Sequence, residues 1–237
     1  MVDEPHIMRA EHGQGRVRLW DRQDAFGPVL ALIALSLVFE AQRASFHPLT
    51  GMVGVVVRVF TLLLTLRTTR DPVRTTRLDV VIVTAVIVLG VAASPKDHDG
   101  PGLVVSSAVL ALVVALQMFV IGRRLLRRGS VDRSTASGAL SVYLLIGSFS
   151  AGIYGILAAG PGALFAAGQG DGNPLVRLYF SFITLTTVGF GDYAPGTPLA
   201  KMVVVLEALT GQLYLVTVVA LVIGGLGASR KDSSQDG

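Results

Sequence analysis

Hydrophobic residues occur in long runs along this chain, and short segments rich in charge, glycine or proline separate them. A membrane-spanning helix needs roughly 20 mostly apolar residues. Six runs approach that length: residues 27–46, 49–66, 78–94, 102–122, 139–159 and 198–226. The first is marginal because Glu40 and Arg43 fall in its last third, and the third is short. The pattern predicts an all-α membrane protein with six transmembrane helices.

The composition agrees with this prediction. Hydrophobic residues make up 51% of the 237 positions and charged residues only 15%, whereas about a quarter is usual in soluble domains. The chain has no cysteine, and its four histidines are scattered without the spacing of metal ligands. No nucleophile–base pair is visible either, so we expect neither an enzyme nor a bound cofactor.

The basic residues indicate the orientation of the spans. If both termini are cytoplasmic, fifteen basic residues lie inside, four lie outside and Arg58 lies within a span. This bias is the one that membrane proteins show, and it predicts a multi-pass protein of the cell membrane. It also accounts for the sequence pI near 9.8 without nucleic-acid binding. Four arginines follow the fourth run, where we expect contact with anionic lipid: Arg123, Arg124, Arg127 and Arg128.

A different kind of segment lies between the fifth and sixth runs. Asn173 and Pro174 form a good helix start, with asparagine as N-cap and proline in the first turn. The helix predicted after them has about 13 residues and a length near 20 Å, which is too short to cross a bilayer. It can only descend partway, and the partial negative charge at its C-terminal end would favour a cation.

The residues after this helix suit an unusual backbone. Glycine reaches the left-handed region without steric cost, so Gly189 and Gly191 allow residues to alternate between right- and left-handed conformations. In such an alternation successive carbonyls point the same way, and the oxygens of residues 187–190 would form a ladder. Oxygens of this kind can replace the hydration shell of an ion. Because one chain supplies one wall, four copies would be needed to enclose the ion.

Residues 184–192 read T-L-T-T-V-G-F-G-D, which resembles the potassium-channel signature T-x-T-T-V-G-Y/F-G-D. Phe190 takes the place of the commoner tyrosine and removes a hydroxyl. The resemblance implies a homotetrameric channel through which K⁺ permeates, with ion-binding oxygens from Thr187, Val188, Gly189, Phe190 and Gly191. It implies that Thr186 and Asp192 support this selectivity filter.

The resemblance extends over residues 139–226. Tyr179 and Phe180 occupy the place of an aromatic pair that braces the filter from behind. Ile183 stands where some bacterial members have a carboxylic acid, so Asp192 is expected to lack that partner. Gly211 falls at the position of a gating hinge. The whole chain is similar to six-span bacterial potassium channels.

The resulting domain prediction has five parts. These are a cytoplasmic N-terminal segment 1–26, a four-helix transmembrane domain 27–128, a cytoplasmic linker 129–138, a pore domain 139–227 and a short cytoplasmic tail 228–237. The pore domain is predicted to contain an outer helix 139–159, a flexible turret 160–173, a pore helix 174–186, a filter 187–192 and an inner helix 198–226.

Two charged residues within the spans have open roles. Glu207, in the inner helix, could sense protons or could brace the pore helix through hydrogen bonds. Arg58 is expected to pair with Glu40 or Asp79 in a structural role. The fourth run has no charge between residues 102 and 122, so the arginines that follow it are expected to anchor the helix at the membrane surface and not to sense voltage.

The sequence therefore favours a potassium-selective channel that is at most weakly gated by voltage. Two alternatives stay open at this stage. One is a poorly selective cation channel, although the intact T-V-G-F-G core argues against it. The other, from a different class, is a multi-span sensor or transporter with a re-entrant loop.

Overall fold

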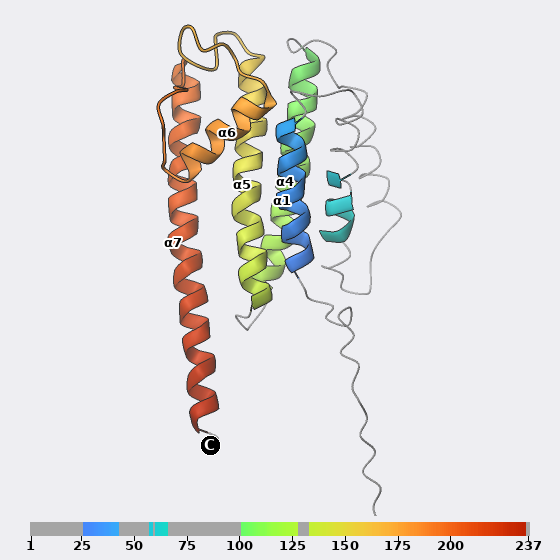
Figure 1. Cartoon of the computed structure of the whole chain (residues 1–237), viewed down its shortest axis with the longest axis vertical. Coiled ribbons are helices and arrows are strands. Elements are labelled where there is room, and N and C mark those ends of the chain that lie inside the picture. The colour runs from blue at the N-terminus through green and yellow to red at the C-terminus, as the bar shows by residue number, and fades with distance from the viewer. Residues whose placement is uncertain (1–25, 43–56, 59, 66–100, 128–132, 236–237) are drawn as a thin grey trace, which may run out of the picture.

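The computed structural model describes residues 26–42, 57–58, 60–65, 101–127 and 133–235. The named helices in these segments are α1 (Gly27–Gln42), α4 (Pro101–Arg127), α5 (Arg133–Ala158), α6 (Pro174–Leu185) and α7 (Pro198–Gln235) (Figure 1). Residues 57–58 and 60–65 are also helical. The described part of the chain has no regular strand, and its one isolated β-bridge joins Phe165 to Pro195. The prediction of an all-helical protein holds for these residues.

Three of the described helices are long and apolar enough to cross a membrane, at Gly102–Arg127, Ser134–Ala158 and Pro198–Leu221. The shorter apolar helices are Gly27–Glu40 and Pro174–Leu185. The predicted span 78–94 lies outside the described residues, and the predicted span 49–66 is described only at 57–58 and 60–65. The count of six spans therefore stays a prediction.

Several helices have ends that differ from those predicted. Helix α5 begins at Arg133, within the segment 129–138 that was expected to be a linker. Helix α7 continues to Gln235, through most of the expected tail 228–237. The sequences at both extensions contain no proline, so nothing removes a backbone donor and the helical hydrogen bonds can continue. Hydropathy locates the apolar part of a helix and does not locate its end.

Helix α5 is the centre of the described structure. It contacts α1, α4, α6 and α7, and Figure 1 shows α6 lying across the space between α5 and α7 near one end of both helices. Small residues let these helices approach α5. A Cβ atom added at Gly147 would lie 2.8 Å from Phe182 Cζ, and one added at Gly155 would lie 2.3 Å from Ser107 Oγ. Close approach at small residues is a main source of helix association in membranes.

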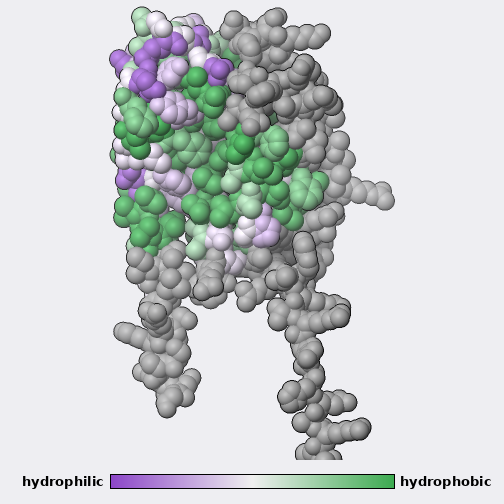
Figure 2. Space-filling model, viewed as in Figure 1, coloured by the Kyte–Doolittle hydropathy of each residue, from purple (hydrophilic) through white to green (hydrophobic). Residues whose placement is uncertain are grey.

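Two groups of buried side chains flank α5. The first joins α1, α4 and α5 with the end of α6: Phe26, Val29, Ile33, Val114, Ile121, Val142, Leu145, Ile146 and Leu185. The second joins α4, α5, α6 and the start of α7 with the segment between α5 and α6: Leu103, Tyr154, Ala158, Leu164, Phe165, Phe180, Ile183 and Ala200. In the view of Figure 2, hydrophobic residues cover the middle of the described surface, and hydrophilic residues gather at the end that carries these loops.

Candidate functional site

The short helix α6 positions the loop that follows it. The Asn173 side chain accepts a hydrogen bond of 3.0 Å from the Val176 N–H and so caps the N-terminus of α6. Arg177 is buried in the first turn, and its Nη1 donates to the Gly172 carbonyl at 2.5 Å. The 12 residues of α6 give it a length of about 18 Å. The asparagine cap and the short length were both expected from the sequence.

Beyond Leu185 the backbone N–H groups turn back onto the last carbonyls of α6. The Thr187 N–H donates to the Thr184 carbonyl at 3.0 Å, and the N–H groups of Val188 and Gly189 both donate to the Ile183 carbonyl, at 2.9 and 3.1 Å. Among the described residues, no hydrogen bond ends on the carbonyl oxygens of residues 187–190. The backbone N–H groups of residues 187–189 are therefore paired with α6, while the carbonyl oxygens of residues 187–190 have no partner among the described residues.

The backbone of this loop alternates in the sign of φ. The angle is 60° at Thr187, 50° at Gly189 and 80° at Gly191, whereas Val188 and Phe190 between them do not have positive φ. Thr187 is the one non-glycine residue with positive φ in the described part of the chain, and a β-branched residue in this region is strained. Strain of this kind concentrates at functional sites. The glycines made the alternation predictable, but its extension to Thr187 was not.

The loop is open to its surroundings in the single chain. The side chains of Val188 and Phe190 are 53% and 70% exposed, and residues 186–192 are all exposed. One chain thus offers one surface of unpaired carbonyl groups and does not enclose a space by itself.

Tyr179 contacts the loop through both its hydroxyl group and its ring. Its hydroxyl donates to Asp192 Oδ2 at 2.8 Å, and its ring stacks on the Phe190 ring with centroids 6.5 Å apart and planes 4° from parallel. Asp192 therefore has a partner even though Ile183 provides no carboxylic acid. The stacked ring also gives Phe190 a contact that does not need the missing hydroxyl.

Phe180, by contrast, contacts aromatic rings outside the loop at residues 187–191. Its ring lies 5.2 Å from that of Tyr154 and 5.0 Å from that of Phe165. Of the expected aromatic pair, the structure brings only Tyr179 to the loop, because adjacent residues of a helix point about 100° apart. Phe180 instead packs α6 against α5 and against Phe165 in the segment between these two helices.

The segment 160–173, which the sequence predicts to be a flexible turret, is tied by hydrogen bonds to residues 192–194. The Ala166 N–H donates to the Ala194 carbonyl at 2.8 Å. The Gln169 side chain donates to the Asp192 carbonyl at 2.7 Å and accepts from the Ala194 N–H at 3.1 Å, so it bridges the backbone on both sides of Tyr193. The sequence prediction missed Gln169. The apolar pair at 164–165 among glycines was the available sign that part of the turret is buried.

Gly211 of α7 lies directly against the end of α6. A Cβ atom at this position would lie 2.5 Å from Leu185 Cδ1 and 2.9 Å from the Leu185 carbonyl oxygen. Gly211 is buried, and α7 continues through it as one helix. The geometry thus gives this glycine a role in close packing beside the start of the loop, and the gating hinge that the sequence suggested stays a prediction.

Glu207 is buried one turn before Gly211, where three helices meet. Its carboxyl group lies within hydrogen-bonding distance of the Tyr154 hydroxyl of α5 and the Ser181 hydroxyl of α6. These contacts match the brace that was considered for Glu207. Its two partners were not foreseen, although a serine and a tyrosine inside apolar helices were the visible signs.

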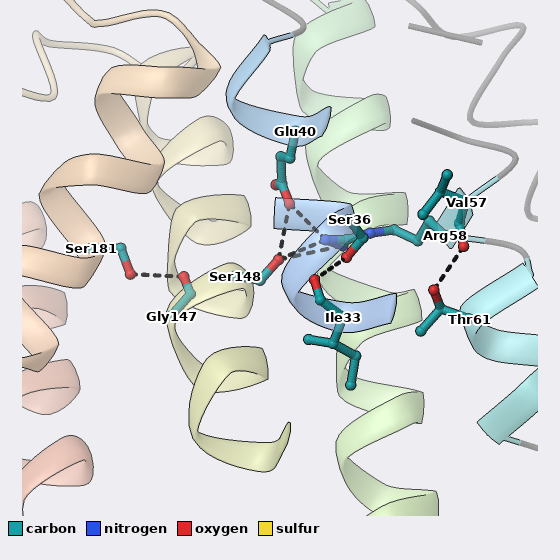
Figure 3. Close-up of polar contacts among 9 residues, drawn as sticks. All are labelled: Ile33, Ser36, Glu40, Val57, Arg58, Thr61, Gly147, Ser148 and Ser181. Atoms are coloured by element: carbon teal, nitrogen blue, oxygen red, sulfur yellow. Dashed lines mark hydrogen bonds and ion pairs between the residues drawn. The ribbon is translucent and has the colours of Figure 1, made fainter. Parts of the chain in front are cut away.

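A second polar cluster lies on the other side of α5. Arg58 Nη2 lies 2.6 Å from Glu40 Oε2 and 2.8 Å from Ser148 Oγ, and Figure 3 shows the three side chains converging. Arg58 therefore pairs with Glu40, which was one of its two expected partners. The other, Asp79, lies outside the described residues.

The arginines at the end of α4 lie within the helix. The sequence prediction ended this span at residue 122, but α4 continues to Arg127 and includes Arg123 and Arg124. Cations at a helix C-terminus are favoured by the helix dipole, and the Arg124 guanidinium lies 5.7 Å from the centroid of the Phe26 ring. Arg128 lies outside the described residues, and contact with lipid stays a prediction.

Comparison with known protein families identifies a match to part of the chain. Residues 141–225 match a family model described as "Ion channel". The match covers a little over a third of the chain and includes most of α5, all of α6, the loop and much of α7. It supports an ion channel, and together with the apolar helices it supports a membrane protein that conducts ions passively.

The contact at Gly211 generates a prediction. The substitution Gly211→Ala forces a methyl group against Leu185, and overpacking of this kind costs about 1–3 kcal/mol. We expect a lower thermal unfolding temperature in detergent, even though alanine is the better helix former by about 1 kcal/mol. Gly224→Ala is the matched control, since Gly224 is in the same helix and has no neighbour within 4 Å. If Gly211→Ala were as stable as Gly224→Ala, a hinge role without close packing would be the better description.

Proposed function

We propose that this chain is one subunit of a potassium-selective channel with the selectivity filter at residues 187–191. The proposal rests on the backbone conformation and the backbone hydrogen bonding of these residues. Their φ angles alternate in sign, the first three N–H donors bind α6, and the carbonyl oxygens of residues 187–190 have no partner among the described residues. Unpaired backbone acceptors within a membrane need a partner, and a desolvated cation is a suitable one.

Potassium is the ion favoured by the chemistry of this loop. Rings of backbone carbonyls replace the hydration shell of K⁺ in channels, and the T-V-G-F-G sequence supplies the matching residues. The C-terminal end of α6 adds a partial negative charge beside the filter. Tyr179 and Asp192 hold the outer end of the loop, so the oxygens keep their positions when the ion leaves.

The pore is completed by four copies of the chain. Residues 186–192 are exposed in one chain, and only 11% of the apolar window of α7 is buried, compared with 61% for α5. Other copies packed on α7 would cover this surface and bring four filter loops around one axis. In this arrangement α6 is the re-entrant pore helix of a six-span chain, with both termini in the cytoplasm of a cell-membrane protein.

The two alternatives have less support. A poorly selective channel would be expected to alter the T-V-G-F-G core, which is intact. A sensor or transporter would not need a loop whose backbone N–H groups are paired and whose carbonyl oxygens are unpaired. The family match at residues 141–225 also favours a channel.

The first prediction from this proposal concerns assembly. One loop lines a quarter of the pore, and closed rotational symmetry is usual for homo-oligomers. Chemical cross-linking of the purified protein in detergent should therefore give a ladder that ends at the tetramer. A ladder that ended at the dimer at every cross-linker concentration would contradict the proposed pore.

The second prediction concerns the filter backbone. In Gly189→Ala, an L-residue must hold the left-handed conformation, at a cost of about 1–2 kcal/mol in each subunit. Because four strained positions meet in one ring, potassium flux in liposomes should fall to background. A Cβ atom at Gly189 would have no neighbour within 4 Å in the chain, so the effect would come from the backbone and not from a clash.

Gly170→Ala is the matched control for this prediction. Gly170 has φ of 65° and also lacks a neighbour within 4 Å, but it lies in the turret. It should keep potassium flux within about twofold of the wild type, since a similar backbone strain of about 1–2 kcal/mol acts outside the filter. Normal potassium flux through Gly189→Ala would rule out the carbonyl ladder in this protein.

The third prediction is weak dependence on voltage. Steep sensing takes about 3–4 charges in each subunit, each worth roughly 2.3 kcal/mol per 100 mV. Residues 102–122 of α4 carry no charge, and Arg58 is held by Glu40. Currents from reconstituted channels should vary smoothly between roughly −100 and +100 mV, the range in which sensors work. Neutralising Arg123 and Arg124 together should leave the curve unchanged. A steep curve that this double substitution abolished would show that α4 is a sensor.

A further inference from the structure

Glu207 is a carboxylic acid enclosed by three helices and by hydroxyl groups. The side chain is 4% exposed, and its partners Tyr154 and Ser181 are 0% exposed. No lysine or arginine among the described residues lies within ion-pair distance of Glu207.

The charged and titratable groups described on the neighbouring helices α5 and α6 provide no cation for Glu207. Helix α5 presents Tyr154, whose hydroxyl donates to Glu207 Oε2. Helix α6 presents Ser181, and Arg177 on the same helix donates its Nη1 hydrogen to the Gly172 carbonyl. An ionised carboxylate at this place would therefore be buried without a compensating cation, which is costly.

Ser181 has one hydroxyl hydrogen but two oxygen atoms within hydrogen-bonding distance. Ser181 Oγ lies 2.7 Å from the Gly147 carbonyl oxygen (Figure 3) and also within hydrogen-bonding distance of Glu207 Oε1. A hydroxyl group has one hydrogen, and a carbonyl oxygen has none. If Ser181 donates to Gly147, the hydrogen between Ser181 and Glu207 must come from Glu207. An ionised Glu207 would leave one of these two contacts without a hydrogen.

We propose that Glu207 carries a proton and donates it in a hydrogen bond to Ser181, so that a neutral carboxylic acid positions the pore helix. The chain of donors then runs from Glu207 to Ser181 and from Ser181 to Gly147, while Tyr154 donates to the other carboxyl oxygen. Every contact has its hydrogen, and α7, α6 and α5 are joined without a buried charge. Glu207 is a positioning residue, since it reaches the filter only through α6.

Glu40 provides a contrast within the same structure. Its Oε2 lies 2.6 Å from the Arg58 guanidinium and 3.2 Å from Ser148 Oγ, which is the setting of an ionised carboxylate. Gly147 and Ser148 are adjacent in α5, and Figure 3 shows their contacts pointing to opposite sides of the helix. The two buried acids are therefore in different protonation states because one has a cation and the other has only hydroxyl groups.

Infrared difference spectroscopy of the reconstituted protein tests this proposal directly. A protonated carboxyl group and a carboxylate absorb at separate frequencies. The wild-type spectrum minus that of Glu207→Gln at about pH 5.5 should contain one acid carbonyl band and no carboxylate bands, although a free glutamate, with a pKa of about 4.3, is mostly ionised at this pH. The same difference for Glu40→Gln should contain carboxylate bands. Carboxylate bands alone in the Glu207 difference would overturn the proposal.

Ser181→Ala is a second test that leaves Glu207 in place. It removes the acceptor for the Glu207 proton, so the acid band should shift to higher frequency. An acid band that did not move would show that the proton is not directed at Ser181, and this part of the proposal would be wrong.

The effect on conduction rests on the proposed function and is measured separately. Glutamine can donate to Ser181 and accept from Tyr154, so Glu207→Gln should keep potassium flux within about twofold of the wild type. Glu207→Leu can do neither and should lose both flux and thermal stability. If Glu207→Gln lost flux as Glu207→Leu does, positioning by a neutral acid would be wrong. If the wild type conducted no potassium but showed the acid band, the proposed function would fail and the protonation of Glu207 would stand.

Discussion

The pairing of backbone donors at the end of α6 determines what the following loop can do. A backbone group in a membrane must find a partner within the protein or a solvated cavity. Here the N–H groups of residues 187–189 bind the carbonyls of Thr184 and Ile183. Since the donors are directed at α6, the carbonyl groups of residues 187–190 are free for another partner. The positive φ angles of Thr187, Gly189 and Gly191 are the conformational requirement of this arrangement.

The other contacts around α6 and the loop maintain this pairing. Tyr179 and Gln169 hold the outer end of the loop at Asp192, and Gly211 lets α7 approach the inner end at Leu185. Helix α5 connects α6 with the first helices through two adjacent residues, because Gly147 accepts from Ser181 of α6 and Ser148 contacts the Glu40–Arg58 pair. A movement of the first helices relative to α5 would thus act next to the anchor of α6.

The sequence predicted the parts of this site that depend on local chemistry. Asparagine followed by proline correctly predicted the residue at which α6 begins. Two glycines in alternate positions indicated the alternating backbone conformation of the loop. Tertiary partners were harder to predict. Tyr179 and Phe180 are neighbours in sequence, yet one stacks on Phe190 of the loop and the other packs on Tyr154. The partners of Asp192, Glu207 and Gln169 depend on the rotation and depth of whole helices, which the hydrophobic pattern does not fix. Helix ends were also missed where no proline marks them.

The central claim is that the carbonyl groups of residues 187–190 select potassium, and ion flux from liposomes containing the purified wild-type protein tests it most directly. Potassium and sodium gradients of equal size would be compared, with and without barium as a blocker. We predict that potassium flux exceeds sodium flux by at least about tenfold, or roughly 1.4 kcal/mol of discrimination, and that barium blocks it. Equal fluxes of the two ions through well-folded tetramers would contradict the claim.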